Sequence, residues 1–216
     1  MTALEDSIAA GAADLGQELP AGAAGQLALL VSELARWNQR VNLTAIRNPD
    51  DMVSGHVLDS LAAAPFLRGT TVLDVGTGAG FPGLPLAIAM PARQFTLLDS
   101  NGKKIRFVQH MIGELGLKNV NTVQARAERY TLPMRFDTVI ARAFAALPRI
   151  LALAGHLVAE TGVLLALKGK DPHAEIRELG APGDSWDCTV TRLTVPGMED
   201  HERHAVCLSR RGTVRA

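Results

Sequence analysis

The sequence is poor in cysteine and has no excess of charge of either sign. Its 216 residues include two cysteines, Cys188 and Cys207. Two cysteines fit neither a framework of several disulfides nor a metal site built from closely spaced thiolates, so we expect a reducing compartment. Lys and Arg together number 22, as do Asp and Glu. Because the protein as a whole does not attract a polyanion such as RNA, any contact with nucleic acid must use a local basic patch.

Targeting and membrane signals are also missing. The first six residues are acidic where a signal peptide would be basic, and the apolar run at 27–31 is too short to span a bilayer. We therefore expect a soluble, cytoplasmic protein with no membrane partner. A hydrophobic content of 47% is sufficient for a core, and the length favours one domain with an extension.

The N-terminal part of the chain predicts helices. Residues 1–24 are rich in Ala and Gly with few bulky apolar side chains, and we expect a weakly ordered tail there, with a short helix around Leu4 to Ala13 as the alternative. Residues 25–68 are expected to form a helical extension. Apolar residues at steps of three and four indicate its first helix, and the second begins after the cap Asn48 and runs to about Ala63. The apolar residues of the first helix are Leu27, Leu30, Val31, Leu34, Trp37 and Val41.

Residues 69–216 have the pattern of an α/β domain. Short β-branched and aliphatic runs alternate with helical stretches, which indicates parallel strands joined by helical crossovers. The last two runs are separated by a turn too short for a crossover helix, so they should pair antiparallel. We expect a Rossmann-like, mostly parallel sheet of seven strands with an antiparallel last strand, in one compact unit with the extension. The expected strands are 71–75, 94–98, 120–124, 137–141, 162–168, 187–195 and 203–209, and the expected helices are 83–90, 101–115, 144–159 and 172–179.

The first predicted strand runs into a glycine-rich loop. Gly76, Gly78 and Gly80 follow Asp74 at the end of the strand, and glycine lets the backbone turn sharply and approach a ligand closely. An Asp-x-Gly-x-Gly-x-Gly pattern is typical of methyltransferases and indicates S-adenosylmethionine as the cofactor. Residues 78–83 also satisfy the dinucleotide-binding fingerprint, so the spacing of the glycines leaves NAD and FAD open.

Three further groups follow neighbouring strands of the predicted sheet. Asp99 ends the second strand, about 20 residues after the loop, where a carboxylate accepts hydrogen bonds from ribose hydroxyls. Residues 124–128, after the third strand, can reach an adenine, and Arg142, after the fourth, can clamp a carboxylate or a phosphate. Because ligands bind at the carboxyl ends of the strands in an open parallel sheet, we expect these groups to share one crevice.

With these segments together, the chain resembles the RsmG (GidB) family of ribosomal small subunit methyltransferases over residues 27–209. The combination of a His-x-x-Asp-Ser segment with a Gly-Phe-Pro-Gly segment is far more specific than the glycine loop. The matching segments are Trp37-Asn38, Asn42-Leu43-Thr44, His56-Val57-Leu58-Asp59-Ser60-Leu61, Asp74-Val75-Gly76-Thr77-Gly78-Ala79-Gly80-Phe81-Pro82-Gly83, Leu97-Leu98-Asp99-Ser100, Lys103-Lys104, Arg142-Ala143 and Leu167-Lys168-Gly169.

The resemblance implies a class I methyltransferase fold in which residues 69–216 form the methyltransferase domain. It implies transfer of a methyl group from S-adenosyl-L-methionine, which leaves S-adenosyl-L-homocysteine, to N7 of a guanine in the 530 loop of 16S ribosomal RNA, guanine 527 in the family's RNA numbering. The partner would be 16S ribosomal RNA or the 30S subunit, and we expect a monomer. The family's cofactor contacts fall here on Gly76, Phe81, Asp99, Ser100, Asn101, Ala127, Glu128 and Arg142, and the backbone argument adds Gly78 and Gly80.

Methylation of guanine N7 needs no general base, because this nitrogen has an in-plane lone pair and carries no proton. We therefore expect no catalytic residue in the sense of proton transfer. Alignment of the reactants and exclusion of water can lower the activation free energy by about 7 kcal/mol or more in favourable systems. We also expect no metal site, because His201 and His204 lack the helical i,i+4 spacing and further ligands.

Basic side chains near the strand ends and in the extension are candidates for RNA contacts, because they can neutralise phosphates whatever the base sequence. Lys168, at the end of an otherwise apolar strand, is the first choice. The candidates are Lys168, Lys103, Lys104, Arg106, Lys170, Arg36, Arg40 and His56.

Three other functions stay open at this point. The overlapping fingerprint allows a nicotinamide- or flavin-dependent oxidoreductase. The lack of an acid/base pair allows a non-catalytic ribosome-binding module with the same fold. The neutral net charge allows a small-molecule methyltransferase, although the matching segments reach into the helical extension.

Overall fold

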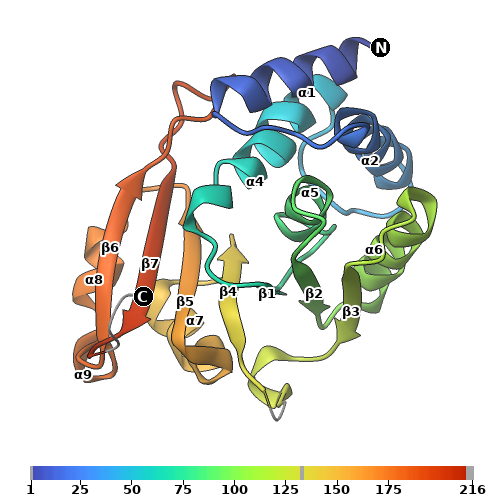
Figure 1. The fold of residues 1–216 in the computed structure, drawn as a ribbon. Coiled ribbons are helices and arrows are strands. Elements are labelled where there is room, and N and C mark those ends of the chain that lie inside the picture. Colours follow the sequence, from blue (N-terminus) through green and yellow to red (C-terminus); the bar gives the residue numbers. More distant parts are fainter. Residues whose placement is uncertain (1, 132–133, 213–216) are drawn as a thin grey trace.

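The sheet of this protein has the expected α/β topology. The computed structural model describes residues 2–131 and 134–212, so the outermost residues of the predicted ranges, 1 and 213–216, lie outside it. Within the described residues, seven strands form one sheet in the order β3-β2-β1-β4-β5-β7-β6 (Figure 1). The strands are β1 (Thr71–Val75), β2 (Gln94–Asp99), β3 (Val120–Gln124), β4 (Phe136–Arg142), β5 (Val158–Lys168), β6 (Trp186–Arg192) and β7 (His204–Arg210).

Strands β1 to β5 pair in parallel, and β7 lies between β5 and β6 and runs antiparallel to both. This confirms the mostly parallel sheet with an antiparallel last strand. The parallel order puts the carboxyl ends of β1, β2, β3 and β4 at one edge of the sheet, where the glycine loop, Asp99, the segment 124–128 and Arg142 follow them.

Two hydrophobic cores cover the two faces of the sheet. In β1, Val72 belongs to the core shared with the N-terminal helices, α5 (Gly83–Ala89) and α6 (Gly102–Leu115). Leu73 and Val75 point to the opposite core, which contains α7 (Leu147–Ala154). Alternate strand residues therefore bury both faces, as expected for a parallel sheet covered by helices. The remaining elements are η2 (Ala64–Phe66), η3 (Ala127–Arg129), η4 (Gly155–Leu157), α8 (His173–Arg177) and α9 (Gly180–Gly183).

The predicted helix 144–159 is wrong at both ends. Helix α7 begins only at Leu147, because Ala143 has a left-handed backbone, with φ 48°, and Pro148 favours the first turn. It ends at Ala154, where one 3₁₀ turn leads directly into β5. The apolar residues at 155–158 belong to the 3₁₀ turn and to the start of β5. Hydrophobic periodicity alone does not distinguish this arrangement from a longer helix.

An ordered helix occupies half of the segment expected to be a weakly ordered tail. Helix α1 (Ala3–Asp14) begins with a capping box in which Thr2 and Glu5 each accept a hydrogen bond from the other's backbone, both 3.3 Å long. The side chains on its buried face are mostly small. Ile8 is buried, and Gly11 lies directly against Leu58. Small residues thus allow a close approach that compensates for the shortage of bulky side chains.

The rest of the extension is helical, as predicted. Helix α2 (Ala23–Asn38) packs against α1, α5 and α6, and these helices share the core on one face of the sheet. The second helix begins after Asn48, whose side chain accepts from the backbone of Asp50. It continues as α3 (Pro49–Met52), the π-helix η1 (Val53–Leu58) and α4 (Asp59–Leu61). Across the described residues, every helix is too short or too polar to cross a membrane.

Docking of α1 predicts opposite effects for two Gly→Ala substitutions in helices. A Cβ at Gly11 would overlap the buried Leu58 side chain, whereas a Cβ at Gly113 in α6 would meet nothing within 4 Å. Gly113→Ala should raise the free energy of unfolding by roughly 0.5–1 kcal/mol. Gly11→Ala should lower it by about 1 kcal/mol, because overpacking outweighs the gain in helix propensity. Urea unfolding of both variants measures this, and equal stabilisation by the two would contradict the docking.

Candidate functional site

The glycine loop after β1 is closed by backbone hydrogen bonds. The backbone N–H groups of Gly76 and Thr77 both donate to the carbonyl of Leu98, at 2.8 and 3.0 Å, which holds the loop against β2. Gly76 has a left-handed backbone, with φ 69°, and a Cβ there would overlap the Phe144 ring. Glycine is therefore required at 76 both for the turn and for the close approach of the segment after β4.

Asp74 lies beneath this loop and is fully buried. Its Oδ2 accepts hydrogen bonds from the Thr77 hydroxyl, at 2.6 Å, and from the backbone of Gly83, at 2.9 Å. Its Oδ1 has no partner among the described residues. Burial raises the pKa of Asp74 to about 6, and the bonds from Thr77 and Gly83 oppose that rise. The loop thus encloses a negative charge with an unused acceptor atom.

Asp99 connects the loop to the end of β2. Its Oδ2 accepts from the backbone N–H of Gly78, at 2.9 Å, and its Oδ1 accepts from that of Asn101, at 2.8 Å. Each carboxylate oxygen has room for a second hydrogen bond. Asp99 can therefore hold the loop and still accept hydrogen bonds from a ligand's hydroxyl groups.

Two adjoining cavities open at the carboxyl ends of the strands. The Asp99 cavity has a volume of about 410 Å³ and the His56 cavity about 490 Å³, within the size range of small-molecule sites. Gly76, Lys104 and Ala143 line both cavities, so the two meet beside the glycine loop. The Asp99 cavity is also lined by Asp99, Ser100, Arg126, Ala127, Glu128 and Phe144, and the His56 cavity by Thr44, His56, Asp59, Gly78, Phe81, Arg142, Lys168 and Arg203.

Eight of the ten residues predicted to contact the cofactor line these two cavities. The other two lie elsewhere. Asn101 caps α6 and lines a separate surface hollow with Lys103 and Arg106. Gly80 is buried, and a Cβ there would overlap Leu84, so it serves the packing of the loop.

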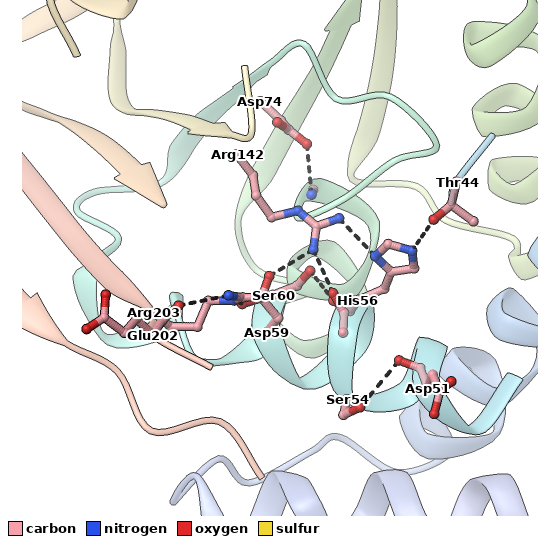
Figure 2. Close-up of polar contacts among 12 residues, drawn as sticks. Thr44, Asp51, Ser54, His56, Asp59, Ser60, Asp74, Arg142, Glu202 and Arg203 are labelled. Atoms are coloured by element: carbon pink, nitrogen blue, oxygen red, sulfur yellow. Dashed lines mark hydrogen bonds and ion pairs between the residues drawn. The ribbon is translucent and has the colours of Figure 1, made fainter. Parts of the chain in front are cut away.

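A buried ion-pair network lines one side of the His56 cavity (Figure 2). Asp59, from the helical extension, is 5% exposed. Its Oδ2 accepts from Nη1 of Arg142, at 2.9 Å, and its Oδ1 accepts from Nε of Arg203, at 3.0 Å. Arg142 ends β4, and Arg203 directly precedes β7. The extension and the sheet are therefore joined by one carboxylate and two guanidinium groups.

His56 continues this network toward Thr44 (Figure 2). Its Nδ1 lies 3.2 Å from Nη2 of Arg142, and its Nε2 lies 2.7 Å from the Thr44 hydroxyl. Because a guanidinium group has only donors, Nδ1 must carry the lone pair and Nε2 the hydrogen. Burial, with the charge of Arg142 next, lowers the pKa of His56 to about 3, and a backbone hydrogen bond with Gly55 opposes that fall. The imidazole is therefore neutral at physiological pH, and it stacks on Phe81 at 4.8 Å between ring centroids.

The prediction that His56 contacts RNA as a basic side chain conflicts with this geometry. The residue is 9% exposed and neutral, with both ring nitrogens occupied. The candidate Lys168 is also engaged, because its Nζ pairs with Glu175 at 2.8 Å and donates to the carbonyl of Ala145 at 3.1 Å. Lys168 therefore holds the segment after β4 that walls the Asp99 cavity.

The other basic candidates are more accessible. Arg36 pairs with Glu33 on the surface of α2. Lys104 is half-buried and lines both cavities. The exposed candidates are Arg36, Arg40, Lys103, Arg106 and Lys170. Their contact with RNA stays a prediction.

Sequence reasoning assigned no role to Thr44, Asp59 or Arg203. The first two lie in the segments that carry the family resemblance, and the three-residue spacing of His56 and Asp59 puts both on one side of a helix. That spacing could have indicated that His56 and Asp59 act together in the site. Arg203 had no such signal, because it lies 144 residues from Asp59 in the sequence.

The buried, neutral His56 predicts a specific pH dependence of stability. The unfolded chain protonates this histidine near pH 6.5 and the folded protein only near pH 3. Stability therefore falls as pH drops from 6.5 toward 3, by up to about 1.4 kcal/mol per pH unit. Asp74 acts in the opposite direction, because its raised pKa makes the folded state bind a proton first as pH falls through 6.

Comparison with a His56→Gln variant removes the contribution of Asp74, which both proteins contain. Urea unfolding should show that the wild type loses about 2–3 kcal/mol relative to the variant between pH 7 and pH 4.5. Parallel pH profiles of the two proteins would mean that His56 titrates normally in the folded state.

Comparison with known proteins identifies relatives over most of the chain. A family model described as GidB, rRNA small subunit methyltransferase G, matches residues 24–206. A protein of Idiomarina loihiensis named ribosomal RNA small subunit methyltransferase G is 49% identical, and the match covers 86% of this chain and 88% of the relative. A protein of the same name from Stenotrophomonas maltophilia is 46% identical, with 92% of each chain covered.

Solved structures share the fold at low sequence identity. The glycopeptide N-methyltransferase MtfA, complexed with S-adenosyl-L-methionine, superposes with a TM-score of 0.62 at 13% identity, over 73% of this chain and 88% of that one. The structure titled DhpI-SAH complex gives 0.57 at 16% identity, over 88% and 97%. These likenesses establish a class I methyltransferase fold. On the family model and the close relatives, the chain belongs to the rRNA small subunit methyltransferase G family.

Proposed function

We propose that this protein transfers a methyl group from S-adenosyl-L-methionine to N7 of a guanine in the 530 loop of 16S ribosomal RNA, guanine 527 in the family's RNA numbering. The family makes it an S-adenosylmethionine-dependent methyltransferase of ribosomal RNA. The observation that carries the finer proposal is the meeting of two cavities at Gly76. One cavity can take the methyl donor, and the other can take an extruded base.

The Asp99 cavity fits the donor. Asp99 keeps lone pairs for the two ribose hydroxyls, and Ala127 and Glu128 lie where an adenine would extend. Buried Asp74 lies beneath the glycine loop, and its negative charge favours the donor's cationic end above it. When bound, S-adenosylmethionine supplies a methyl group activated by its sulfonium charge.

Methyl transfer requires the protein to align N7, the methyl carbon and the sulfur atom. The N7 lone pair forms the new bond to the methyl carbon, the carbon–sulfur pair of electrons returns to sulfur, and the methylated base carries the positive charge. No proton leaves N7. A histidine with a pKa of about 3 is a poor base at neutral pH, so the His56 cavity supports positioning rather than proton transfer.

The exposed basic side chains provide the local patch that a neutral protein needs for RNA. Lys103 and Arg106 lie on α6 beside the Asp99 cavity, and Lys170 follows β5. We propose that they contact phosphates of the small subunit, with the extension 25–68 and the domain 69–216 acting as one unit. A monomer acting in the cytoplasm completes the proposal.

Methylation of 30S subunits and of protein-free 16S RNA tests the proposed function. Subunits from a strain that lacks the enzyme should gain one 7-methylguanine, which mass spectrometry of nuclease fragments should map to the 530 loop. A methyl group on another atom or in another loop would overturn the finer proposal. Binding of both substrates without methyl transfer would favour a non-catalytic module.

Substitution of Asp99 tests the donor site. Asp99→Ala removes the acceptor of the Gly78 N–H and of the ribose hydroxyls, and it should weaken binding of S-adenosylhomocysteine at least tenfold, about 1.4 kcal/mol. The matched control is Asp187→Ala, which removes an exposed aspartate of β6 that pairs with Arg211. This variant should bind normally. Calorimetric titration measures both. Tighter binding of NADH than of S-adenosylhomocysteine by the wild type would favour an oxidoreductase instead.

A further inference from the structure

The Thr44 side chain ends the network that begins at Asp59, and it faces the His56 cavity. Its backbone is held by Asn38, which is 4% exposed. The Asn38 Oδ1 accepts from the N–H groups of Leu43 and Thr44, at 2.8 and 3.0 Å, and its Nδ2 donates to the Thr44 carbonyl, at 2.9 Å. The hydroxyl is therefore held by a rigid segment, as is required of a group that recognises a ligand specifically.

Both lone pairs of the Thr44 hydroxyl are used inside the protein. The Nε2–H of His56 donates to Oγ1 at 2.7 Å, and the backbone N–H of Ile46 donates to it at 3.2 Å. A hydroxyl has two acceptor lone pairs and one hydrogen to donate. Among the residues that the structure describes, no hydrogen bond uses that hydrogen. What Thr44 offers to the cavity is thus a single donor.

Arg142 determines the direction of the hydrogen bond between His56 and Thr44. If Nδ1 of His56 carried the hydrogen, Nε2 would accept and the Thr44 hydroxyl would donate to it. Because Arg142 directs an N–H group at Nδ1, this contact favours the tautomer with the hydrogen on Nε2, in which the Thr44 hydrogen stays free. Arg142 itself directs N–H groups at Asp59, at the Gly55 carbonyl and at His56.

A neutral donor with a fixed direction in the base cavity distinguishes the two purines. The edge of guanine that contains N7 has two acceptors, N7 and O6, whereas adenine has N7 and the donor group N6–H₂ at the same places. A donor beside the reacting N7 pairs with O6 of guanine and opposes the amino group of adenine. Lys104, which also lines the cavity, is a flexible point charge and lacks this fixed direction.

We propose that Thr44 selects guanine over adenine by donating its hydroxyl hydrogen to O6, beside the N7 that receives the methyl group. The inference rests on the proposed function and names the group that specifies its base. The proton remains on the Thr44 oxygen throughout, so Thr44 reads the substrate and takes no part in the chemistry.

Thr44→Val tests the proposal, because valine has the shape of threonine without the hydroxyl. The substrates are 30S subunits assembled on 16S RNA that carries guanine, inosine or 2,6-diaminopurine at the target position. The variant should lose roughly tenfold to a hundredfold in kcat/KM on guanine, and its preference for guanine over diaminopurine should shrink by a similar factor. Thr44→Ser should restore both. The control Thr191→Val, on the exposed side of β6, should match the wild type.

A merely structural role would give a different pattern. Loss of hydrogen-bond partners for His56 and Ile46 alone would lower kcat/KM equally for all three bases, and it would weaken S-adenosylhomocysteine binding or lower Tm. An unchanged guanine preference in Thr44→Val would overturn the proposal.

The wild type alone provides a second measurement that requires no variant to fold. Inosine keeps O6 and N7, so it should be methylated at N7 within a few-fold of guanine, and diaminopurine should be poor. Equal methylation of diaminopurine and guanine would overturn the role of O6. If the wild type forms no 7-methylguanine at all, the proposed function fails and this inference fails with it. If it forms 7-methylguanine without discrimination at position 6 of the base, only the role of Thr44 fails.

Discussion

The buried pair between Asp59 and Arg142 is the interaction on which the rest of the site depends. A carboxylate that is 5% exposed needs charged partners, because a buried charge without compensation is destabilising by several kcal/mol. Asp59 obtains them from the end of β4 and from Arg203, just before β7. The helical extension is therefore tied into the sheet at the point where the cavities open, and it provides Thr44, His56 and Asp59 as one wall of the acceptor cavity.

One consequence of this pair is a fixed order of donors and acceptors. Arg142 donates to Asp59 and to His56, the imidazole is thereby held as a neutral acceptor at Nδ1, and its other nitrogen donates to Thr44. The π-helix η1 contains His56 and directly precedes Asp59, in keeping with the frequent presence of π-turns at functional sites. On the donor side, Asp74 is surrounded by a hydroxyl and a backbone N–H instead of a paired cation, so burial raises its pKa.

The sequence predicted what local pattern determines. The strands, the glycine loop, the cap at Asn48 and the position of Asp99 follow from periodicity and turn chemistry. The structure has them at or near the expected positions, although β5 begins four residues earlier than 162 and β6 ends three residues before 195. Several features that the sequence did not predict depend on tertiary contacts. Helix α1 is ordered because Gly11 permits contact with Leu58, and Lys168 is engaged because Glu175 lies beside it. The ion pairs of Asp59 join residues 83 and 144 positions apart, which no single sequence places together.

Nitrogen NMR of the histidine side chains shows whether Arg142 fixes the tautomer of His56. In protein labelled with ¹⁵N, long-range couplings between the ring protons and the two nitrogens identify which nitrogen of His56 carries hydrogen. We expect an unprotonated Nδ1 and a protonated Nε2, unchanged from pH 5 to pH 8, since the pKa is about 3. A hydrogen on Nδ1, or a doubly protonated ring in this range, would contradict it.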